Sequence, residues 1–199
     1  MVKNYVTENL LLNFIVRMEE VTVHEDGTVD VDGDVQVSRN HMPWHKLPVR
    51  FGKVKGSFMM AQQPQLETLE GCPSECWEFY VGLRDKGPLT NLLHSPRIVH
   101  NKFVIDAWSL TSLEGCPEQI EGYISIPVPK PMGLLRTLVA KRGFHSKFDD
   151  RYMSWKVYQK VQEAQEIINK EKWQGKGKLG AIPCAAELIR AGLSEYAKW

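Results

Sequence analysis

Hydrophobic positions in the middle of the chain recur at a nearly regular spacing. The octet Leu66-Glu-Thr-Leu-Glu-Gly-Cys-Pro73 returns as Leu110-Thr-Ser-Leu-Glu-Gly-Cys-Pro117, and looser copies begin at Trp44 and Leu89. The second leucine of each copy stands at position 47, 69, 92 or 113, so successive copies are 22, 23 and 21 residues apart. Periods of this length are typical of leucine-rich repeats, in which each unit supplies one short strand and one return turn.

Each octet is followed by apolar residues two positions apart, which is the mark of a strand that buries one face. Seven residues beyond the second leucine stand Val54, Cys76, Val99 and Ile120. Eleven and thirteen residues beyond it stand two further columns: Phe58, Tyr80, Phe103 and Ile124, then Met60, Gly82, Ile105 and Ile126. The sequence therefore predicts an α/β repeat fold, a leucine-rich-repeat-like parallel β-solenoid of about five rungs over residues 31–126.

Both ends of such an array need a cap, because an open end exposes the core to water. Residues 1–30 are predicted to form an N-terminal cap and hairpin, since Asp26-Gly27 lies between two alternating segments that resemble strands. At the other end Pro127, Pro129 and Pro131 lack ladder donors, so we expect them to end strand addition at Ile126.

Residues 127–199 are predicted to form a C-terminal helical region that caps the solenoid. A short helix is expected over residues 132–142 and a longer one over about residues 150–172, capped by Asp149 or Asp150. The longer helix has one apolar face: Met153, Val157, Val161, Ala164 and Ile168. Pro183 is expected to open a last helix, with these residues inward: Ala185, Leu188, Ile189, Leu193 and Tyr196.

The octets resemble a group of leucine-rich-repeat-like proteins that tailed bacteriophages encode, most of them uncharacterised. The likeness covers roughly residues 20–126. A Gly-Lys-rich turn over residues 175–180, followed by an Ala-rich helix, extends it over residues 151–199. The resemblance implies a phage origin and a place in the cytoplasm of the bacterial host, and it implies no particular chemistry.

Composition and charge narrow the function classes. A formal net charge of +1 with 25% charged residues argues against a nucleic-acid binder driven by bulk charge. The longest apolar run, residues 10–16, is shorter than the roughly 20 residues that a membrane helix needs. It also lacks the flanks of a secretory signal, so we expect a soluble intracellular protein without a membrane partner.

Candidate metal ligands do not stand at metal-binding spacings. Three aspartates alternate at positions 30, 32 and 34, but the glycine and glutamate of a calcium loop are missing, so the outer face of a strand explains them better. Pro43 separates His41 from His45, and Cys72 and Cys76 have no matching second pair. No metal or cofactor is therefore expected.

Cysteines at the repeat positions are predicted to pack the turns. Cys72 and Cys116 occupy the same place in their octets, where the sister copies carry Arg50 and Ser95. A thiol that a hydroxyl replaces in a sister unit is most simply filling a turn.

Two surfaces are candidates for binding a partner. Outward positions of the predicted strands form an apolar ladder: Met59, Phe79, Val81, Val104 and Tyr123. Either the C-terminal helices or a partner protein should cover it, and a helix of about 23 residues, about 34 Å long, is long enough to do so.

If a helix covers the ladder, recognition falls to the return-turn side: His41, Trp44, His45, Gln63, Gln65, Arg84, Lys86 and Trp108. Two of these residues, Trp44 and Trp108, are either binding anchors or plugs at the ends of the core. The sequence leaves both readings open.

These observations predict a non-enzymatic phage protein that binds a host protein, for example as an inhibitor of a defence, transcription or replication factor. One alternative is a nucleic-acid-associated protein that uses the basic C-terminal turn, with Lys172, Trp173, Lys176 and Lys178. The other is a small hydrolase-type enzyme, whose cleft would draw on His100, His145, Asp149 and Asp150.

Overall fold

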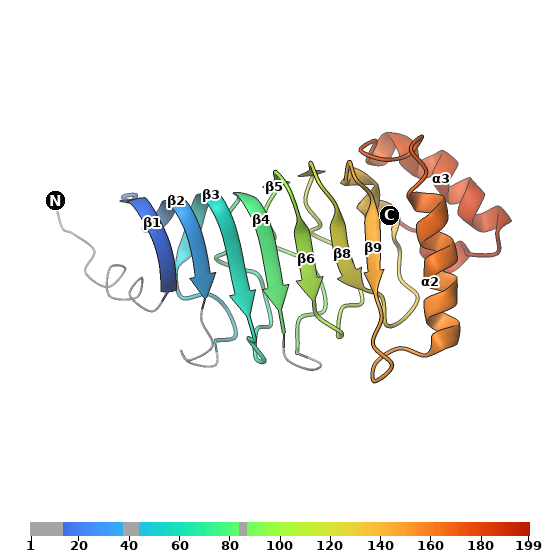
Figure 1. The fold of residues 1–199 in the computed structure, drawn as a ribbon, viewed down its shortest axis with the longest axis horizontal. Helices are drawn as coiled ribbons and strands as arrows, with labels where there is room; N and C mark the ends of the chain where they lie inside the picture. The colour runs from blue at the N-terminus through green and yellow to red at the C-terminus, as the bar shows by residue number, and fades with distance from the viewer. Residues whose placement is uncertain (1–13, 38–43, 84–86) are drawn as a thin grey trace.

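The computed structural model describes residues 14–37, 44–83 and 87–199. These residues form a parallel β-solenoid of about five turns followed by two helices, so the predicted fold class is confirmed. The main path through the sheet runs β1-β2-β3-β4-β6-β8-β9 and places β1 at one end and the helices at the other (Figure 1).

The strands follow the two-residue alternation of the sequence: β1 (Phe14–Val23), β2 (Thr28–Val37), β3 (Arg50–Ala61), β4 (Glu75–Gly82), β5 (Ile98–Val99), β6 (Phe103–Asp106), β7 (Gln119–Ile120), β8 (Ile124–Pro127) and β9 (Phe144–Lys147). Strand β1 pairs antiparallel with β2, with Val21 opposite Val31, so the predicted hairpin is confirmed. The pairings from β2 onward are parallel. Strands β5 and β7 continue the sheet beside the first half of β4, so these two rungs are bent strands in two parts.

One column of the core follows the predicted repeat positions without change. Its members pair from rung to rung and are each 0% exposed: Val54, Cys76, Val99 and Ile120. The second leucines of the octets are also buried, at 6% exposure or less: Leu47, Leu69, Leu92 and Leu113. The repeat read from the sequence is therefore the repeat of the core.

A second column is aromatic and corrects the predicted register in one rung. Phe58 pairs with Phe79, not with Tyr80, and Phe79 stacks in turn on Phe103. The ring centroids lie 5.8 Å and 5.3 Å apart, with nearly parallel planes. Between residues 54 and 57 the register shifts by one, because β3 carries one more residue than β4 over this step.

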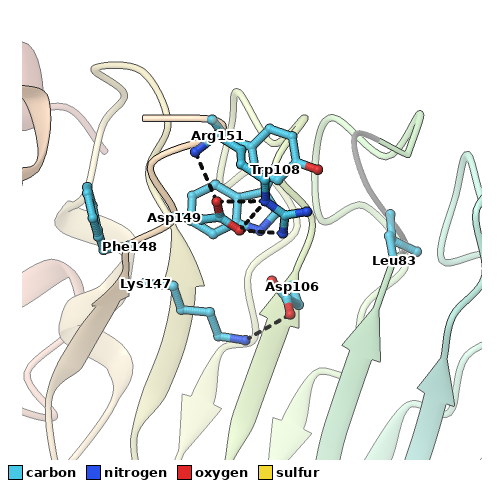
Figure 2. A pocket seen from close by; sticks show the side chains of 8 residues that line it. Leu83, Asp106, Trp108, Lys147, Phe148, Asp149 and Arg151 are labelled. Carbon is cyan, nitrogen blue, oxygen red and sulfur yellow. Dashed lines mark hydrogen bonds and ion pairs between the residues drawn. The ribbon is translucent and has the colours of Figure 1, made fainter. Parts of the chain in front are cut away.

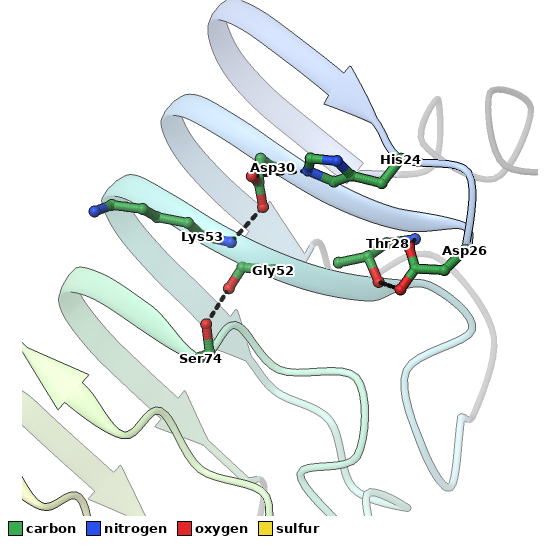
Figure 3. Close-up of polar contacts among 7 residues, drawn as sticks. All are labelled: His24, Asp26, Thr28, Asp30, Gly52, Lys53 and Ser74. Atoms are coloured by element: carbon green, nitrogen blue, oxygen red, sulfur yellow. Dashed lines mark hydrogen bonds and ion pairs between the residues drawn. The ribbon is translucent and has the colours of Figure 1, made fainter.

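Two carboxylates on β2 accept hydrogen bonds from the backbone of β3. Asp30 Oδ1 accepts the Lys53 N–H at 2.6 Å, and Asp34 Oδ1 accepts the Ser57 N–H at 2.7 Å; Figure 3 shows the Asp30 contact. The residue before each of these amides is a glycine, and a Cβ there would overlap the carboxylate. The alternating aspartates therefore have structural partners on the neighbouring strand.

Hydroxyl and thiol groups at the cysteine position of the octets reach toward the next turn. Ser95 Oγ donates to the Gly115 carbonyl at 2.6 Å, and Cys116 Sγ lies 3.9 Å from the Arg136 carbonyl oxygen. Cys72 is buried, at 8% exposure. This placement fits the predicted turn-packing role.

Strand β9 adds a rung beyond the prolines, so the prediction that strand addition ends at Ile126 is wrong. It pairs parallel with β8, from Ile124 opposite Phe144 to Pro127 opposite Lys147. A parallel neighbour bonds only alternate N–H groups of a strand, so the missing donor of Pro127 does not prevent the pairing.

Side chains near the C-terminal half of α2 (Trp155–Ile168) bond the outer edge of β9. Asn169 Oδ1 accepts the Phe144 N–H at 2.7 Å, and Asn169 Nδ2 donates to the Phe144 carbonyl at 2.6 Å. Gln165 Oε1 accepts the Ser146 N–H at 2.6 Å. These amides occupy the backbone groups that a further strand would use, so they end the sheet in place of the prolines.

The helix α2 confirms the predicted buried face but not the predicted length. Val161, Ala164 and Ile168 are buried. The helix has 14 residues and its N-cap is Ser154, not Asp149 or Asp150. It packs beside β9 at the end of the solenoid and does not lie across the sheet face (Figure 1). The reading in which the C-terminal helices cover that face is therefore wrong.

Two further helix predictions are corrected. Within residues 132–142 the structure has only the 3-10 helix η1 (Leu135–Val139). The helix α3 (Lys178–Arg190) begins five residues before Pro183, and Ile189 is 57% exposed instead of inward. Other predicted inward residues are buried: Leu188, Leu193 and Tyr196, the last within the 3-10 helix η2 (Ser194–Tyr196).

Candidate functional site

A cavity of about 620 Å³ opens at the C-terminal ends of strands β4, β6 and β9. Three lining residues come from those strand ends: Leu83, Asp106 and Lys147. The others are Trp108 and four residues of the loop that leads from β9 to α2: Phe148, Asp149, Arg151 and Tyr152. In Figure 2 the Lys147–Asp106 and Arg151–Asp149 pairs lie between Phe148 on one side and Leu83 on the other.

The charged groups of the cavity are paired with one another. Lys147 Nζ lies 3.7 Å from Asp106 Oδ2, and Arg151 Nη2 lies 2.7 Å from Asp149 Oδ2. Burial lowers the pKa of Lys147, against the opposing effect of Asp106, and the Arg151 hydrogen bonds hold the pKa of Asp149 below its ordinary value. A cavity with balanced charges suits an uncharged or amphipathic ligand surface better than a free ion.

Aromatic rings form one wall of the cavity. Trp108 packs against Tyr152, with ring centroids 5.3 Å apart, and the Arg151 guanidinium carbon lies 5.1 Å from the Tyr152 ring centroid. Trp108 is only 8% exposed, so it belongs to the core as well as to the cavity wall. The exposed surface for a ligand must therefore come from its neighbours.

Those neighbours form an exposed ring cluster beside the cavity. Phe148 lies 5.6 Å from Trp155 and 4.7 Å from Tyr158 between ring centroids, and Trp155 lies 5.4 Å from Tyr158. Trp155 is 60% exposed and Phe148 is 41% exposed. Phe148 belongs to both groups, so together they make one surface. We call it the aromatic corner: Trp108, Phe148, Arg151, Tyr152, Trp155 and Tyr158.

Among the described residues that were predicted on the return-turn side, only Trp108 joins this surface. His41, Arg84 and Lys86 lie outside the described residues. Trp44 is half-buried and packs against the core, and His45 is exposed, with its Nδ1 2.8 Å from Glu67 Oε1. Gln63 is buried, whereas Gln65 is exposed.

The predicted apolar ladder on the sheet face is corrected by the register shift. Phe79 and Val81 are 0% exposed, so the prediction that they point outward is wrong, and Tyr80 takes the outward place. Met59 and Tyr123 are half-buried on the outer face, as predicted. Ion pairs cross the same face: Lys53–Glu75, Lys55–Asp32 and Lys102–Glu78. The face is therefore mixed in polarity, not an apolar stripe.

The residues of the hydrolase-type alternative are not brought together at the cavity. Asp149 lines it, held by Arg151, whereas His145 is exposed on β9 with its ring 5.1 Å from that of Tyr123. His100 lies elsewhere, with Nε2 2.8 Å from Glu75 Oε1. The described residues that line the cavity include no Ser, Thr, Cys or His side chain.

In the nucleic-acid alternative, the basic C-terminal turn would offer lysine charges and the Trp173 ring. The structure exposes the lysines of the turn but buries the ring. Lys176 and Lys178 are exposed, but Trp173 is only 9% exposed. The Lys172 ammonium lies 4.4 Å from the Trp173 ring centroid and 2.9 Å from Glu187 Oε2. Trp173 therefore does not offer a face on which a base could stack.

The aromatic corner was not predicted, although the sequence contains a signal for it. Aromatic residues stand at 148, 152, 155 and 158, steps of four, three and three that match one side of a helix. The apolar periodicity favoured the other side, the buried stripe that begins at Met153. An aromatic set offset from the buried face of an amphipathic segment is the pattern to seek.

Comparisons with known proteins found no similar protein for this chain. No protein-family model matches the chain, and neither the curated proteins nor the solved structures include a significant match. Within the described ranges, no helix combines the length and the apolar character needed to cross a bilayer. The same residues include no group of three or more side chains arranged to hold a metal ion.

Proposed function

We propose that this chain is a non-enzymatic binding protein of bacteriophage origin, which docks on a host protein through the aromatic corner. The observation that carries the proposal is the exposed contact of Phe148 with Trp155, continuous with the cavity that Trp108, Tyr152 and Arg151 line. Tryptophan, tyrosine and arginine dominate binding hot spots, because each joins a large apolar area to a polar group. A phage origin rests on the octets alone.

The fold supports this role by supplying a rigid base. Lys147 and Asp106 hold the floor of the cavity from two strand ends, and Ser154 fixes the start of α2 by accepting the Val157 N–H. Side chains on rigid elements lose little conformational entropy on binding. The partner would therefore meet a largely preformed surface, and covering a working face of a defence, transcription or replication factor would inhibit it.

Affinity purification from infected cells, with quantitative mass spectrometry, tests the proposal. The baits are the wild type, the double variant Phe148→Ala/Trp155→Ala and the control Trp77→Ala. Trp77 is a matched tryptophan, 50% exposed on the sheet face. A specific host protein should be enriched by the wild type and by Trp77→Ala, and lost with the double variant.

Two results would count against the proposal. Equal recovery with all three baits would place binding away from the aromatic corner, and loss with Trp77→Ala alone would move the site to the sheet face. Because the corner's charges are paired internally, recovery should also change little with ionic strength.

A further inference from the structure

The outer face of α3 carries an apolar stripe that nothing in the described residues covers. Leu179 is 89% exposed, Ile182 is 82% exposed and Ile189 is 57% exposed, with exposed Ala186 between the last two. Steps of three, four and three residues align these side chains along one side of the helix. The stripe is about 15 Å long at 1.5 Å per residue. We call it the outer stripe of α3, and it shares no residue with the aromatic corner.

Positive charge stands at both ends of this stripe. Lys178 begins the helix and Arg190 ends it, and neither makes an ion pair with any residue that the structure describes. The acidic residue of the helix, Glu187, is held by both Lys170 and Lys172. The helix therefore presents an apolar seam between cationic ends, without an exposed anion of its own to neutralise them.

We propose that the outer stripe of α3 is a docking site for an acidic amphipathic helix of another protein. Such a helix would lay its apolar seam on Leu179, Ile182 and Ile189 and bring carboxylates to Lys178 and Arg190. The proposal goes beyond the function of the aromatic corner and stands independently of it.

Charge and composition favour this occupant over two others. A second copy of this chain could dock its stripe on this one in two orientations. The antiparallel orientation would place Lys178 next to Arg190, and the parallel orientation would place each cation next to its own copy. Both orientations bring like charges together, so both are repulsive. A lipid surface is favoured by Trp or Phe beside Leu on the apolar face, whereas the exposed side chains of this stripe are all aliphatic. A seam at this spacing matches helix-on-helix packing.

The test uses the full chain and two designed helical peptides read by fluorescence anisotropy. One peptide has a leucine seam flanked by glutamates, and the matched peptide has lysine in place of each glutamate. We expect saturable binding of the acidic peptide, at least about tenfold tighter than the basic one, and weaker binding as salt is added. Leu179→Ser/Ile182→Ser should abolish binding without lowering Tm, whereas Leu93→Ser, a change at another exposed leucine, should leave it unchanged.

A charge-reversed variant separates recognition from simple stickiness. Lys178→Glu/Arg190→Glu should invert the preference, so that the basic peptide becomes the tighter ligand. Equal binding of the two peptides, no binding of either, or no effect of the serine variant would overturn the proposal. A dimer that the serine variant dissolves, or flotation on phosphatidylserine vesicles that the variant abolishes, would overturn it in favour of a second copy or a lipid surface.

Discussion

His94 holds the left-handed backbone conformation that Gly115 holds at the same place one turn later, with φ of 67° and 84° respectively. In the regular octets this position is glycine, because a turn toward the next rung requires a positive φ there. The degenerate copy therefore keeps the turn geometry of the repeat and stores strain in a residue with a Cβ.

Replacing His94 by glycine should stabilise the protein. The left-handed conformation costs a residue with a Cβ about 1–2 kcal/mol, and the greater freedom of glycine in the unfolded chain returns part of this. We expect His94→Gly to raise the free energy of unfolding by about 0.5–1 kcal/mol in urea titrations. Gly115→Ala should lower it by more than about 2 kcal/mol, because its Cβ would also overlap the Leu92 carbonyl. A lower free energy of unfolding for His94→Gly would show that the left-handed conformation does not strain His94.

The one-residue register shift predicts a large loss of stability at one aromatic residue and a small loss at its neighbour. Phe79 is 0% exposed between Phe58 and Phe103, so Phe79→Ala should cost about 3–5 kcal/mol of unfolding free energy. Tyr80 is half-buried on the outer face, and Tyr80→Ala should cost about 1 kcal/mol. Chemical denaturation measures both, and a larger loss at Tyr80 would restore the register read from the repeat.

The two octet cysteines should respond differently to serine. Cys116 already faces a carbonyl in the next turn, as Ser95 does, so Cys116→Ser should change the free energy of unfolding by less than about 0.5 kcal/mol. Cys72 is buried, and a hydroxyl placed there without a partner should cost about 1–3 kcal/mol. Equal losses in thermal unfolding would contradict the difference in their surroundings.

The contribution of Glu75 to the free energy of unfolding should depend on pH in the acid range. Hydrogen bonds from Lys53 and then His100 lower its pKa below the ordinary value of 4.5. A carboxyl whose pKa is lower when folded stabilises the protein above its unfolded pKa, and this contribution disappears as pH falls through the folded pKa. The stability gap between wild type and Glu75→Gln should therefore hold steady above about pH 5 and shrink toward about pH 3. A gap that widens on acidification would reverse the sign of the linkage.

The solenoid could be predicted from the repeat spacing alone, because every turn buries residues at the same repeat positions. Repeat spacing alone was enough to predict the burial of the column through Val54 and Cys76 and of the octet leucines. Register inside β4 was mispredicted because the extra residue in β3 lies in an otherwise regular strand, where Phe79 and Tyr80 are equally plausible core residues. Counting from the octet cannot reveal a bulge.

The end of the sheet was mispredicted for a different reason. The prolines signal a stop locally, but the last rung is completed by a strand that begins at Phe144 and by Asn169, which lies on another element. The aromatic corner likewise depends on tertiary placement, since Trp108 and Phe148 come from segments 40 residues apart in sequence. Only the aromatic spacing after β9 was visible in the sequence.

The dissociation constant of the captured host protein, measured by titration calorimetry, tests the account most directly. Phe148→Ala/Trp155→Ala should weaken binding by roughly a hundredfold, or about 2.7 kcal/mol, while Trp77→Ala leaves it unchanged and all three proteins keep the same Tm. An unchanged dissociation constant for the double variant would show that the aromatic corner is not where this protein binds.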